Sequence, residues 1–263
     1  MADELFDLSG RVIAVTGGLG RLGRVFAREL AARGAEVVLL DRADAAMSEP
    51  ISGATHVACD VADRGSVEHA LARIAERRAP DGLVNAAAID SPPGAASAQN
   101  PAPELYPAEL WDEVMAVNVR GVLHCCQVIG GAMARAGRGS IVNIGSIYGM
   151  VAPDQRLYEY RRRRGEEFFK PIAYSASKAA LTNVTRYFAT YWGDAGVRVN
   201  TLTFGGVFDH QDPEFVAAYA ARVPLGRMAR ADEYRGAVVF LLSDASSYMT
   251  GANLVLDGGF TAW

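Results

Sequence analysis

The chain of 263 residues contains few cysteines, and their positions suit neither a disulfide framework nor a metal site. The three are Cys59, Cys125 and Cys126, an odd count that includes a neighbouring pair too close for an ordinary bridge. We therefore expect reduced thiols in a cytoplasmic protein. No Cys-x-x-Cys or His-x-x-x-His spacing occurs and the four histidines are scattered, so no metal site is expected.

The sequence also lacks an excess of positive charge and a long apolar run. Its formal net charge is −4, whereas a surface that binds nucleic acid is normally basic, so we expect no nucleic-acid partner. No apolar run reaches about 18 residues, so we expect no membrane-spanning helix and no membrane partner. The first seven residues are acidic and lack the charged-then-apolar layout of a signal peptide.

Lysine is scarce: Lys170 and Lys178 are the only two, and every other basic side chain apart from histidine is arginine. Lys178 follows Tyr174 by four residues, so on a helix the two side chains share a face and can point into one cleft. A phenol gives up its proton poorly near neutral pH, because its ordinary pKa is about 10. A nearby ammonium favours the phenolate, so the pair is typical of proton transfer.

What the chain does contain is alternating β-branched runs and amphipathic stretches, which indicates βαβ units in one domain, residues 1–263. The pattern predicts a doubly wound α/β fold of Rossmann type, with a seven-stranded parallel sheet covered by helices on both faces. The predicted strands are 11–16, 36–41, 55–59, 82–85, 140–145, 197–203 and 253–256. The predicted helices lie near 22–33, 66–78, 107–135, 173–192, 213–221 and 231–243.

The first predicted strand runs directly into a glycine-rich turn, Thr16-Gly17-Gly18-Leu19-Gly20-Arg21-Leu22-Gly23, after which a helix begins. Glycines let the backbone turn sharply and approach a pyrophosphate, and the first N–H groups of the helix attract anions. Asp41 ends the next predicted strand 18 residues later, as dinucleotide-binding units require. We therefore predict that residues 17–23 bind a dinucleotide.

Asp41 also predicts which dinucleotide binds. Its carboxylate can accept hydrogen bonds from both adenosine-ribose hydroxyls and repels a 2′-phosphate, which favours NAD over NADP. Arg42 follows it and either offsets that preference at the cofactor or is simply solvated. Later strand ends add further predicted cofactor contacts: Asp60 and Val61 after the third strand, and Asn85, Ala86 and Ala87 at the end of the fourth.

Ser146 follows the fifth predicted strand, at the sheet edge where ligands bind in open α/β folds, and Asn118 lies in the long helix before it. The set Asn118, Ser146, Tyr174 and Lys178, behind a glycine-rich first turn, resembles the short-chain dehydrogenase/reductase family over nearly the whole chain. Supporting landmarks are Asn85-Ala86-Ala87-Ala88, Val197-Arg198-Val199-Asn200, Pro224-Leu225-Gly226-Arg227 and Asp257-Gly258-Gly259.

The resemblance implies a role for each of these four residues. Tyr174 would be the general acid/base, Lys178 would bind the nicotinamide ribose and lower the tyrosine pKa, Ser146 would hydrogen-bond the reacting oxygen, and Asn118 would hold a relay water. It implies further cofactor contacts at Gly205 and Val207, and substrate contacts at Ser146, Tyr148, Tyr174, Gly206 and His210. For His210, simple exposure is the competing interpretation.

The chain departs from the family's shorter, single-domain branch in three places. Arg21 stands where a glycine is usual, and Phe204 precedes Gly205 where a Pro-Gly pair is usual. Ser146 and Tyr174 are 28 residues apart, about twice the family's usual separation, so residues 150–170 form an insertion beside the substrate site. The start of that insertion resembles, more weakly, members linked to bacterial surface-sugar biosynthesis.

Residues 161–164 of the insertion are all arginine. They would either clamp a phosphate or carboxylate or belong to a solvated, mobile loop in which Glu166 and Glu167 offset their charge. The polar groups of the insertion suit a hydroxyl-rich substrate.

These observations predict an NAD(H)-dependent oxidoreductase that interconverts a secondary alcohol and a ketone on a sugar, polyol or sugar derivative. A carrier-bound 3-ketoacyl reductase is the alternative enzyme, and a non-catalytic dinucleotide sensor is the alternative from another class. The family resemblance implies a homo-oligomer, a tetramer or dimer, in which the helices at 107–135 and 173–192 pair across subunits.

Overall fold

The computed structural model describes residues 4–45, 49–76, 78–91, 93–97 and 100–263. Its seven strands form one parallel sheet in the order β3-β2-β1-β4-β5-β6-β7. The strands are β1 (Val12–Thr16), β2 (Glu36–Asp41), β3 (Ala54–Ala58), β4 (Gly82–Asn85), β5 (Gly139–Ile144), β6 (Val197–Phe204) and β7 (Asn253–Leu256). Every predicted strand is confirmed, with bounds that differ by no more than one residue.

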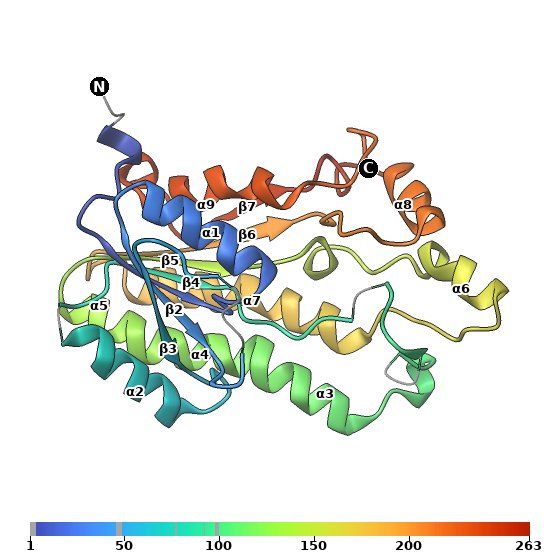
Figure 1. Ribbon diagram of the computed structural model, residues 1–263, viewed down its shortest axis with the longest axis horizontal. Coiled ribbons are helices and arrows are strands. Elements are labelled where there is room, and N and C mark those ends of the chain that lie inside the picture. Colours follow the sequence, from blue (N-terminus) through green and yellow to red (C-terminus); the bar gives the residue numbers. More distant parts are fainter. Residues whose placement is uncertain (1–3, 46–48, 77, 92, 98–99) are drawn as a thin grey trace.

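Helices cover both faces of this sheet, as predicted (Figure 1). On one face α1 (Arg21–Ala32) and α9 (Arg235–Leu242) share a core with alternate residues of β1 and β2. On the other face α2 (Arg64–Ala75), α7 (Ile172–Tyr191) and the long helix between β4 and β5 pack on the remaining strand residues. The region predicted as one helix at 231–243 begins with a 3-10 turn, η8 (Ala231–Tyr234), before α9.

The long helix between β4 and β5 runs continuously over Ala108–Arg135. It consists of α3 (Ala108–Met115), the π-helical η4 (Ala116–Gly121), α4 (Val122–Cys125), the π-helical η5 (Cys126–Gly130) and α5 (Gly131–Arg135). By length and composition it could cross a membrane, contrary to the expectation that no segment would. Half of its apolar window is buried, however, and it packs on the sheet, so the core accounts for its apolar residues.

The insertion is folded, although its sequence suggested a loop. It forms η7 (Gln155–Tyr158) and α6 (Glu159–Arg163), which lie with α8 (Pro213–Ala220) at one end of the molecule (Figure 1). The buried ring of Tyr158 packs between Phe168 and Phe215, with ring centroids 4.9 and 5.5 Å away. These aromatic side chains supply a small separate core, because large apolar surfaces that meet exclude water.

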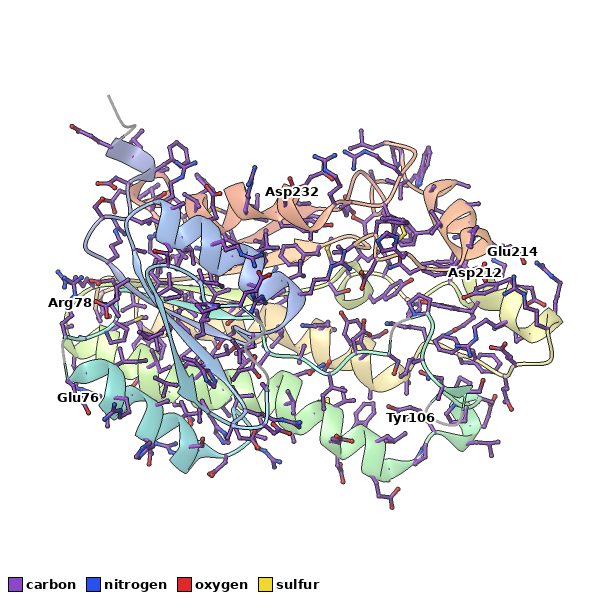
Figure 2. All side chains as sticks on the ribbon, viewed as in Figure 1. Glu76, Arg78, Tyr106, Asp212, Glu214 and Asp232 are labelled. Carbon is purple, nitrogen blue, oxygen red and sulfur yellow. The ribbon has the colours of Figure 1, made fainter. Side chains whose placement is uncertain are left out.

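The four arginines of the insertion hold it in place. Arg161 is buried and donates to the carbonyls of Pro93 and Ala95, at 3.0 and 2.7 Å, as well as pairing with Glu166. Arg162 pairs with Glu159, Arg163 with Glu214, and Arg164 with both Asp212 and Glu214. Figure 2 shows Asp212 and Glu214 at the start of α8, beside the side chains of α6. All four guanidinium groups are thus committed to ion pairs within the fold. The pairing of Arg161 with Glu166 agrees with the expectation that this carboxylate offsets arginine charge, whereas the pairs with Glu159, Asp212 and Glu214 were not anticipated.

Candidate active site

A cleft of about 940 Å³ lies at the carboxyl edge of the sheet, where β1 separates the strand that follows it in the chain, β2, from β4. Such a switch point is where open α/β sheets bind ligands, because the connections after neighbouring strands leave in opposite directions. Residues that follow β1, β2, β4, β5 and β6 line the cleft. Tyr158 and Lys170 of the insertion form part of its wall.

The glycine-rich turn forms one end of this cleft. Gly17 has a φ of +63°, and a Cβ there would lie 2.8 Å from the Cα of Ala87. A Cβ at Gly23 would lie 2.2 Å from the Gly17 carbonyl, so only glycine permits this approach of turn and helix. Gly20 precedes α1 and offers no side-chain cap, which leaves the first N–H groups of the helix beside the cleft for an anion.

The predicted glycine-turn residues do not all reach the cleft. Gly17, Gly20, Arg21, Leu22 and Gly23 line it. Gly18 instead packs against Leu39, and the side chain of Leu19 packs on the core.

Asp41 lies at the next strand end, with Arg42 and Asp60 beside it in the cleft. The carboxylate of Asp41 accepts from the backbone N–H groups of Leu19 and Arg42, both at 2.9 Å, which fixes its orientation. The guanidinium of Arg42 turns to Asp44 and bonds both of its oxygens, at 3.0 and 2.8 Å. Arg42 is therefore already paired beside Asp41.

The side chain of Asn85, a predicted cofactor contact, is bonded within the sheet instead. Its amide donates to Asn143 at 2.8 Å, and Asn143 donates to Thr185 at 2.9 Å, in a buried chain across the sheet. Asn85 is not among the residues that line the cleft, whereas Ala86, Ala87 and Val61 are. The hydroxyl of Thr16 accepts from the N–H groups of Ala86 and Ala87 at 3.1 Å and so holds these two segments together.

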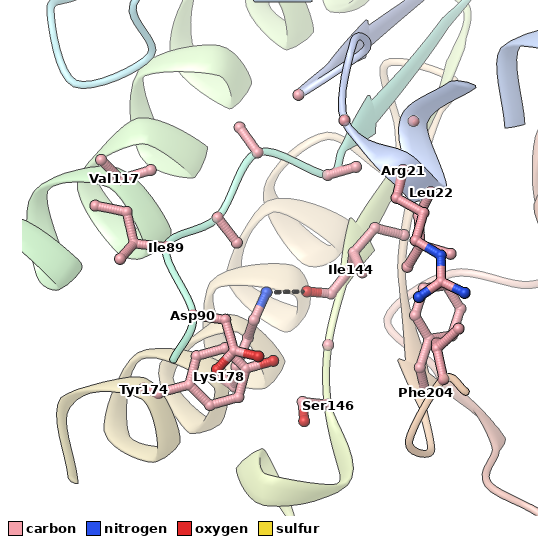
Figure 3. A pocket seen from close by; sticks show the side chains of 18 of the residues that line it. Arg21, Leu22, Ile89, Asp90, Val117, Ile144, Ser146, Tyr174, Lys178 and Phe204 are labelled. Atoms are coloured by element: carbon pink, nitrogen blue, oxygen red, sulfur yellow. Dashed lines mark hydrogen bonds between the residues drawn. The ribbon is translucent and has the colours of Figure 1, made fainter. Parts of the chain in front are cut away.

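Ser146, Tyr174 and Lys178 meet in the middle of the cleft (Figure 3). Ser146 follows β5, and Tyr174 and Lys178 share one face of α7. The hydroxyl of Ser146 is near enough to Tyr174 to favour its ionised form and so to lower its pKa. The Nζ atom of Lys178 donates to the Ile144 carbonyl at 2.8 Å and lies 5.8 Å from the centre of the Tyr174 ring. The sequence-predicted trio is therefore brought together.

Burial dominates the protonation of this trio. It raises the pKa of Tyr174 above its usual range, the charge of Asp90 adds to that shift, and the neighbouring Ser146 hydroxyl opposes it. Burial also lowers the pKa of Lys178 to about 8. The direction for Tyr174 runs against the sequence prediction, because removal of water penalises the phenolate, as it penalises the ammonium of Lys178.

Asn118 lies in the π-helical segment η4 and is buried behind the cleft wall. Its amide donates to the Ile89 carbonyl at 3.0 Å, and its carbonyl accepts from the Ile89 N–H at 2.7 Å. It also donates to Ser177 on α7. Its side chain thus joins the loop after β4 to the helix that carries Tyr174 and Lys178.

The segment after β6 forms the far wall. Phe204 is stacked on Tyr234 with ring centroids 4.1 Å apart, and its edge lines the cleft with Gly205, Gly206 and Val207. Tyr148 also lines it, and burial raises the pKa of its hydroxyl to about 12. His210 has a φ of 54° and lines a smaller neighbouring cavity beside Arg161 and Arg164, so the structure does not bring it to the trio.

The comparisons with known proteins agree with this geometry. A family model described as enoyl-(acyl carrier protein) reductase, of the short-chain alcohol dehydrogenase type, matches residues 21–261. The chain belongs to the short-chain dehydrogenase/reductase family. The fold, the enzyme class and the family predicted from the sequence are thereby confirmed.

Three curated members of this family resemble the chain over almost its full length. D-threitol dehydrogenase of Mycolicibacterium smegmatis is 36% identical, covering 97% of this chain and 95% of that protein. Galactitol 2-dehydrogenase (L-tagatose-forming) of Cereibacter sphaeroides is 34% identical, covering 98% of each. Gluconate 5-dehydrogenase of Gluconobacter oxydans is 35% identical, covering 98% and 97%.

Two solved structures of short-chain dehydrogenases share the fold. One is a gluconate 5-dehydrogenase from Burkholderia cenocepacia in complex with NADP and tartrate, with a TM-score of 0.84, 29% identity, and coverage of 99% of this chain and 98% of that one. The other, from Leptospira borgpetersenii with bound NAD+, has a TM-score of 0.86, 29% identity, and coverage of 97% and 94%.

Sequence reasoning missed two charged residues of this short-chain dehydrogenase's cleft, Asp90 and Lys170. Lys170 ends the insertion and forms an ion pair with Asp90, which follows β4. Its Nζ atom lies 4.5 Å from the centre of the Tyr174 ring. The scarcity of lysine was a usable signal for Lys170. Nothing in the local sequence distinguished Asp90 from a loop carboxylate.

Proposed function

We propose that this protein is an NAD(H)-dependent dehydrogenase that interconverts a secondary alcohol and a ketone on a sugar or polyol. One observation carries the proposal: Ser146, Tyr174 and Lys178 meet in a cleft whose other end is a glycine-rich turn with Asp41 beside it. The first arrangement moves a proton and the second suits a dinucleotide, so a single cleft has the residues for both halves of the reaction.

The roles of the chain's own residues follow from their positions. When bound, the nicotinamide ring supplies the hydride acceptor or donor. Tyr174 takes the proton from the substrate hydroxyl in oxidation and returns it in reduction, while Ser146 donates to the oxygen on which charge develops. Lys178 stabilises the phenolate in its protonated form, which predominates below pH about 8. Asn118 fixes the position of α7 relative to the loop after β4, because its side chain bonds both Ser177 and Ile89.

NAD is the proposed cofactor. Asp41 presents its carboxylate where an adenosine ribose would lie, and Arg42, the neighbouring cation that a 2′-phosphate would need, is paired with Asp44. Gly17, Gly20 and the start of α1 would hold the pyrophosphate. Solved relatives carry either NAD+ or NADP, so the preference is specific to each chain.

A polyol or sugar substrate is supported by the curated relatives, whose names include threitol, galactitol and gluconate. The description of the family model instead points to acyl-carrier substrates, which is the alternative. The charged pair Asp90–Lys170 in the substrate half favours a hydroxyl-rich molecule over an acyl chain, because an apolar chain would leave these polar groups without partners.

We further propose a cytoplasmic homo-oligomer, a tetramer or dimer. The three cysteines are all free and buried, which suits a reducing compartment. Tyr187 and Tyr191 lie 64% and 65% exposed on α7 with stacked rings, an aromatic patch of the kind that subunit interfaces cover. Light scattering that gives the mass of one chain would contradict the oligomer.

The experiment that tests the proposed function follows NADH or NADPH absorbance with the purified protein. The substrate panel contains threitol, galactitol, gluconate and a β-ketoacyl thioester. We expect turnover of a sugar-type alcohol with NAD+ and poor use of NADP+. Turnover of the thioester alone would favour the carrier-bound reductase. Tight NADH binding without turnover of any substrate would favour a dinucleotide sensor.

A further inference from the structure

The substrate half of the cleft contains an ion pair that the proposed reaction does not use. Asp90 follows β4 and is 43% exposed at its side chain, whereas Lys170 ends the insertion and its side chain is only 5% exposed. Figure 3 shows Asp90 beside Tyr174 and close to Lys178. A carboxylate that remains half accessible next to the catalytic tyrosine is placed where a substrate must lie.

The ammonium group of Lys170 already has partners on several sides. The Nζ atom of Lys170 donates to Asp90 and, at 2.9 Å, to the carbonyl of Ser91. The rings of Tyr174 and Tyr148 lie around it, with centres 4.5 and 5.9 Å away. A buried ammonium that is surrounded in this way has little capacity left for a substrate carboxylate.

Only one of the two carboxylate oxygens of Asp90 accepts hydrogen bonds from the described residues. The Oδ1 atom of Asp90 accepts from Lys170 and, at 2.8 Å, from the N–H of Ser91. Its Oδ2 atom accepts no hydrogen bond from the residues the structure describes. A carboxylate oxygen accepts from hydroxyl groups and repels another carboxylate. The open side of the pair therefore suits the hydroxyls of a substrate and disfavours an acid group.

No other cation on this side replaces Lys170. Arg21 pairs with Asp209 at 2.9 Å and also bonds the carbonyl of Phe208. The insertion arginines, residues 161–164, are bound to carboxylates of the fold. Every cationic side chain that borders the substrate half therefore has a carboxylate or carbonyl partner. This holds for the part of the chain that the structure describes, residues 4–45, 49–76, 78–91, 93–97 and 100–263.

We infer that Asp90, positioned by Lys170, is a hydroxyl-binding residue that selects uncharged polyols over their acid counterparts. A polyol hydroxyl donates to the open Oδ2 atom, while the carboxylate of an aldonate meets the negative side of the pair without a counter-ion. This inference rests on the proposed function and narrows its substrate to a neutral polyol.

The first test compares kcat/KM of the unaltered protein for threitol and galactitol with that for gluconate, at saturating NAD+. We expect the better neutral polyol to exceed gluconate by at least about tenfold, the effect of a charge-assisted hydrogen bond. A preference for gluconate would overturn this inference and leave the proposed function intact. No turnover of any of the three substrates would overturn both.

The second test uses Asp90→Asn, which keeps the shape of the side chain and removes its charge. We expect kcat/KM for the polyol to fall about tenfold or more while kcat/KM for gluconate rises, since Lys170 is then unneutralised. Asp90→Ser serves as a second variant if the amide impairs folding. The matched control is Asp194→Asn, an exposed carboxylate in the turn between α7 and β6, which should leave the ratio of the two values unchanged.

A change in the acidity of Tyr174 cannot imitate this result. The same tyrosine serves both substrates, so a shift in its pKa moves both pH profiles together and cancels in the ratio of kcat/KM values. The ratio is therefore measured across the pH profile of each variant. An unchanged ratio in Asp90→Asn and Asp90→Ser would show that Asp90 does not select the substrate.

Discussion

The two halves of the cleft differ in the groups that build them. The dinucleotide half presents mostly backbone, in a turn where Gly17 and Gly23 permit approaches that no side chain would allow. The substrate half presents side chains from the insertion and α8, held by Arg161 and its neighbours in ion pairs. A backbone site can serve many relatives that share one cofactor type, whereas a side-chain site can be changed one residue at a time. This difference explains how relatives with one fold carry different substrate names.

The largest effect is expected at Tyr174, where the two halves meet. Tyr174→Phe removes the oxygen that we propose transfers the proton and keeps the ring, so kcat should fall about 10²–10⁴-fold while NADH affinity changes little. Steady-state rates and NADH fluorescence titration measure the two quantities. Equal losses in rate and in cofactor affinity would mean that the hydroxyl has a structural role, and the halves would then not be separable.

Arg161 tests whether the insertion can be altered without disturbing the cofactor half. Arg161→Leu leaves two backbone carbonyls without their donor and the half-exposed Glu166 without its partner, so we expect a loss of about 1–3 kcal/mol in stability and a higher KM for the polyol. Denaturant melts and substrate kinetics measure this, with the NADH dissociation constant nearly unchanged. Arg156→Ala is the control, because that 81% exposed side chain pairs with Asp154 at the surface. A similar loss in the control would contradict the anchoring role.

The fold was predictable because it depends on pattern. The strands were recognisable as short apolar runs that alternate with amphipathic stretches, and the glycine turn from its place between a strand and a helix. Each predicted strand appears within one residue of its expected bounds. Ser146, Tyr174 and Lys178 were predictable as a set because strand ends and helix faces bring them together.

The substrate half was not predictable, because its contacts join residues far apart in the chain. Lys170 meets Asp90 across 80 positions, and Arg161 meets Pro93 across 68. No local pattern records such a pairing. The direction of the pKa shift of Tyr174 was missed for a related reason: burial, which depends on the whole fold, is its largest cause.

A smaller change is expected at Asp41, on the dinucleotide side. Asp41→Ala removes the carboxylate that we propose binds the ribose and repels a 2′-phosphate, so the proposed preference for NAD+ over NADP+ should fall about tenfold to a hundredfold. The ratio of kcat/KM for the two cofactors measures it, and the relative rates with threitol and gluconate should stay the same. A shift in substrate preference would show that the two halves are coupled.

The smallest change in stability is expected at Lys178, where the substitution should stabilise the fold instead of destabilising it. Burial lowers the pKa of Lys178 from 10.5 to about 8, so below pH 8 the folded protein contains an ammonium whose desolvation costs about 3 kcal/mol. Lys178→Met removes that cost but loses the hydrogen bond to Ile144, which offsets about 1–2 kcal/mol. We expect a net stabilisation of about 1–2 kcal/mol below pH 8, together with the loss of activity.

The sign of its pH dependence separates this explanation from better packing. Between pH 8 and 10.5 the unfolded chain binds more protons at Lys178 than the folded one, so the stability of the unaltered protein rises with pH through this group. The advantage of Lys178→Met should therefore be largest below pH 8 and should turn into a net loss of about 1–2 kcal/mol near pH 10.5, where only the missing hydrogen bond remains. Urea melts of both proteins at several pH values measure the difference, in which all other titrating groups cancel. A constant advantage across this range would assign the gain to packing, and the buried charge at the centre of the cleft would then cost the fold little.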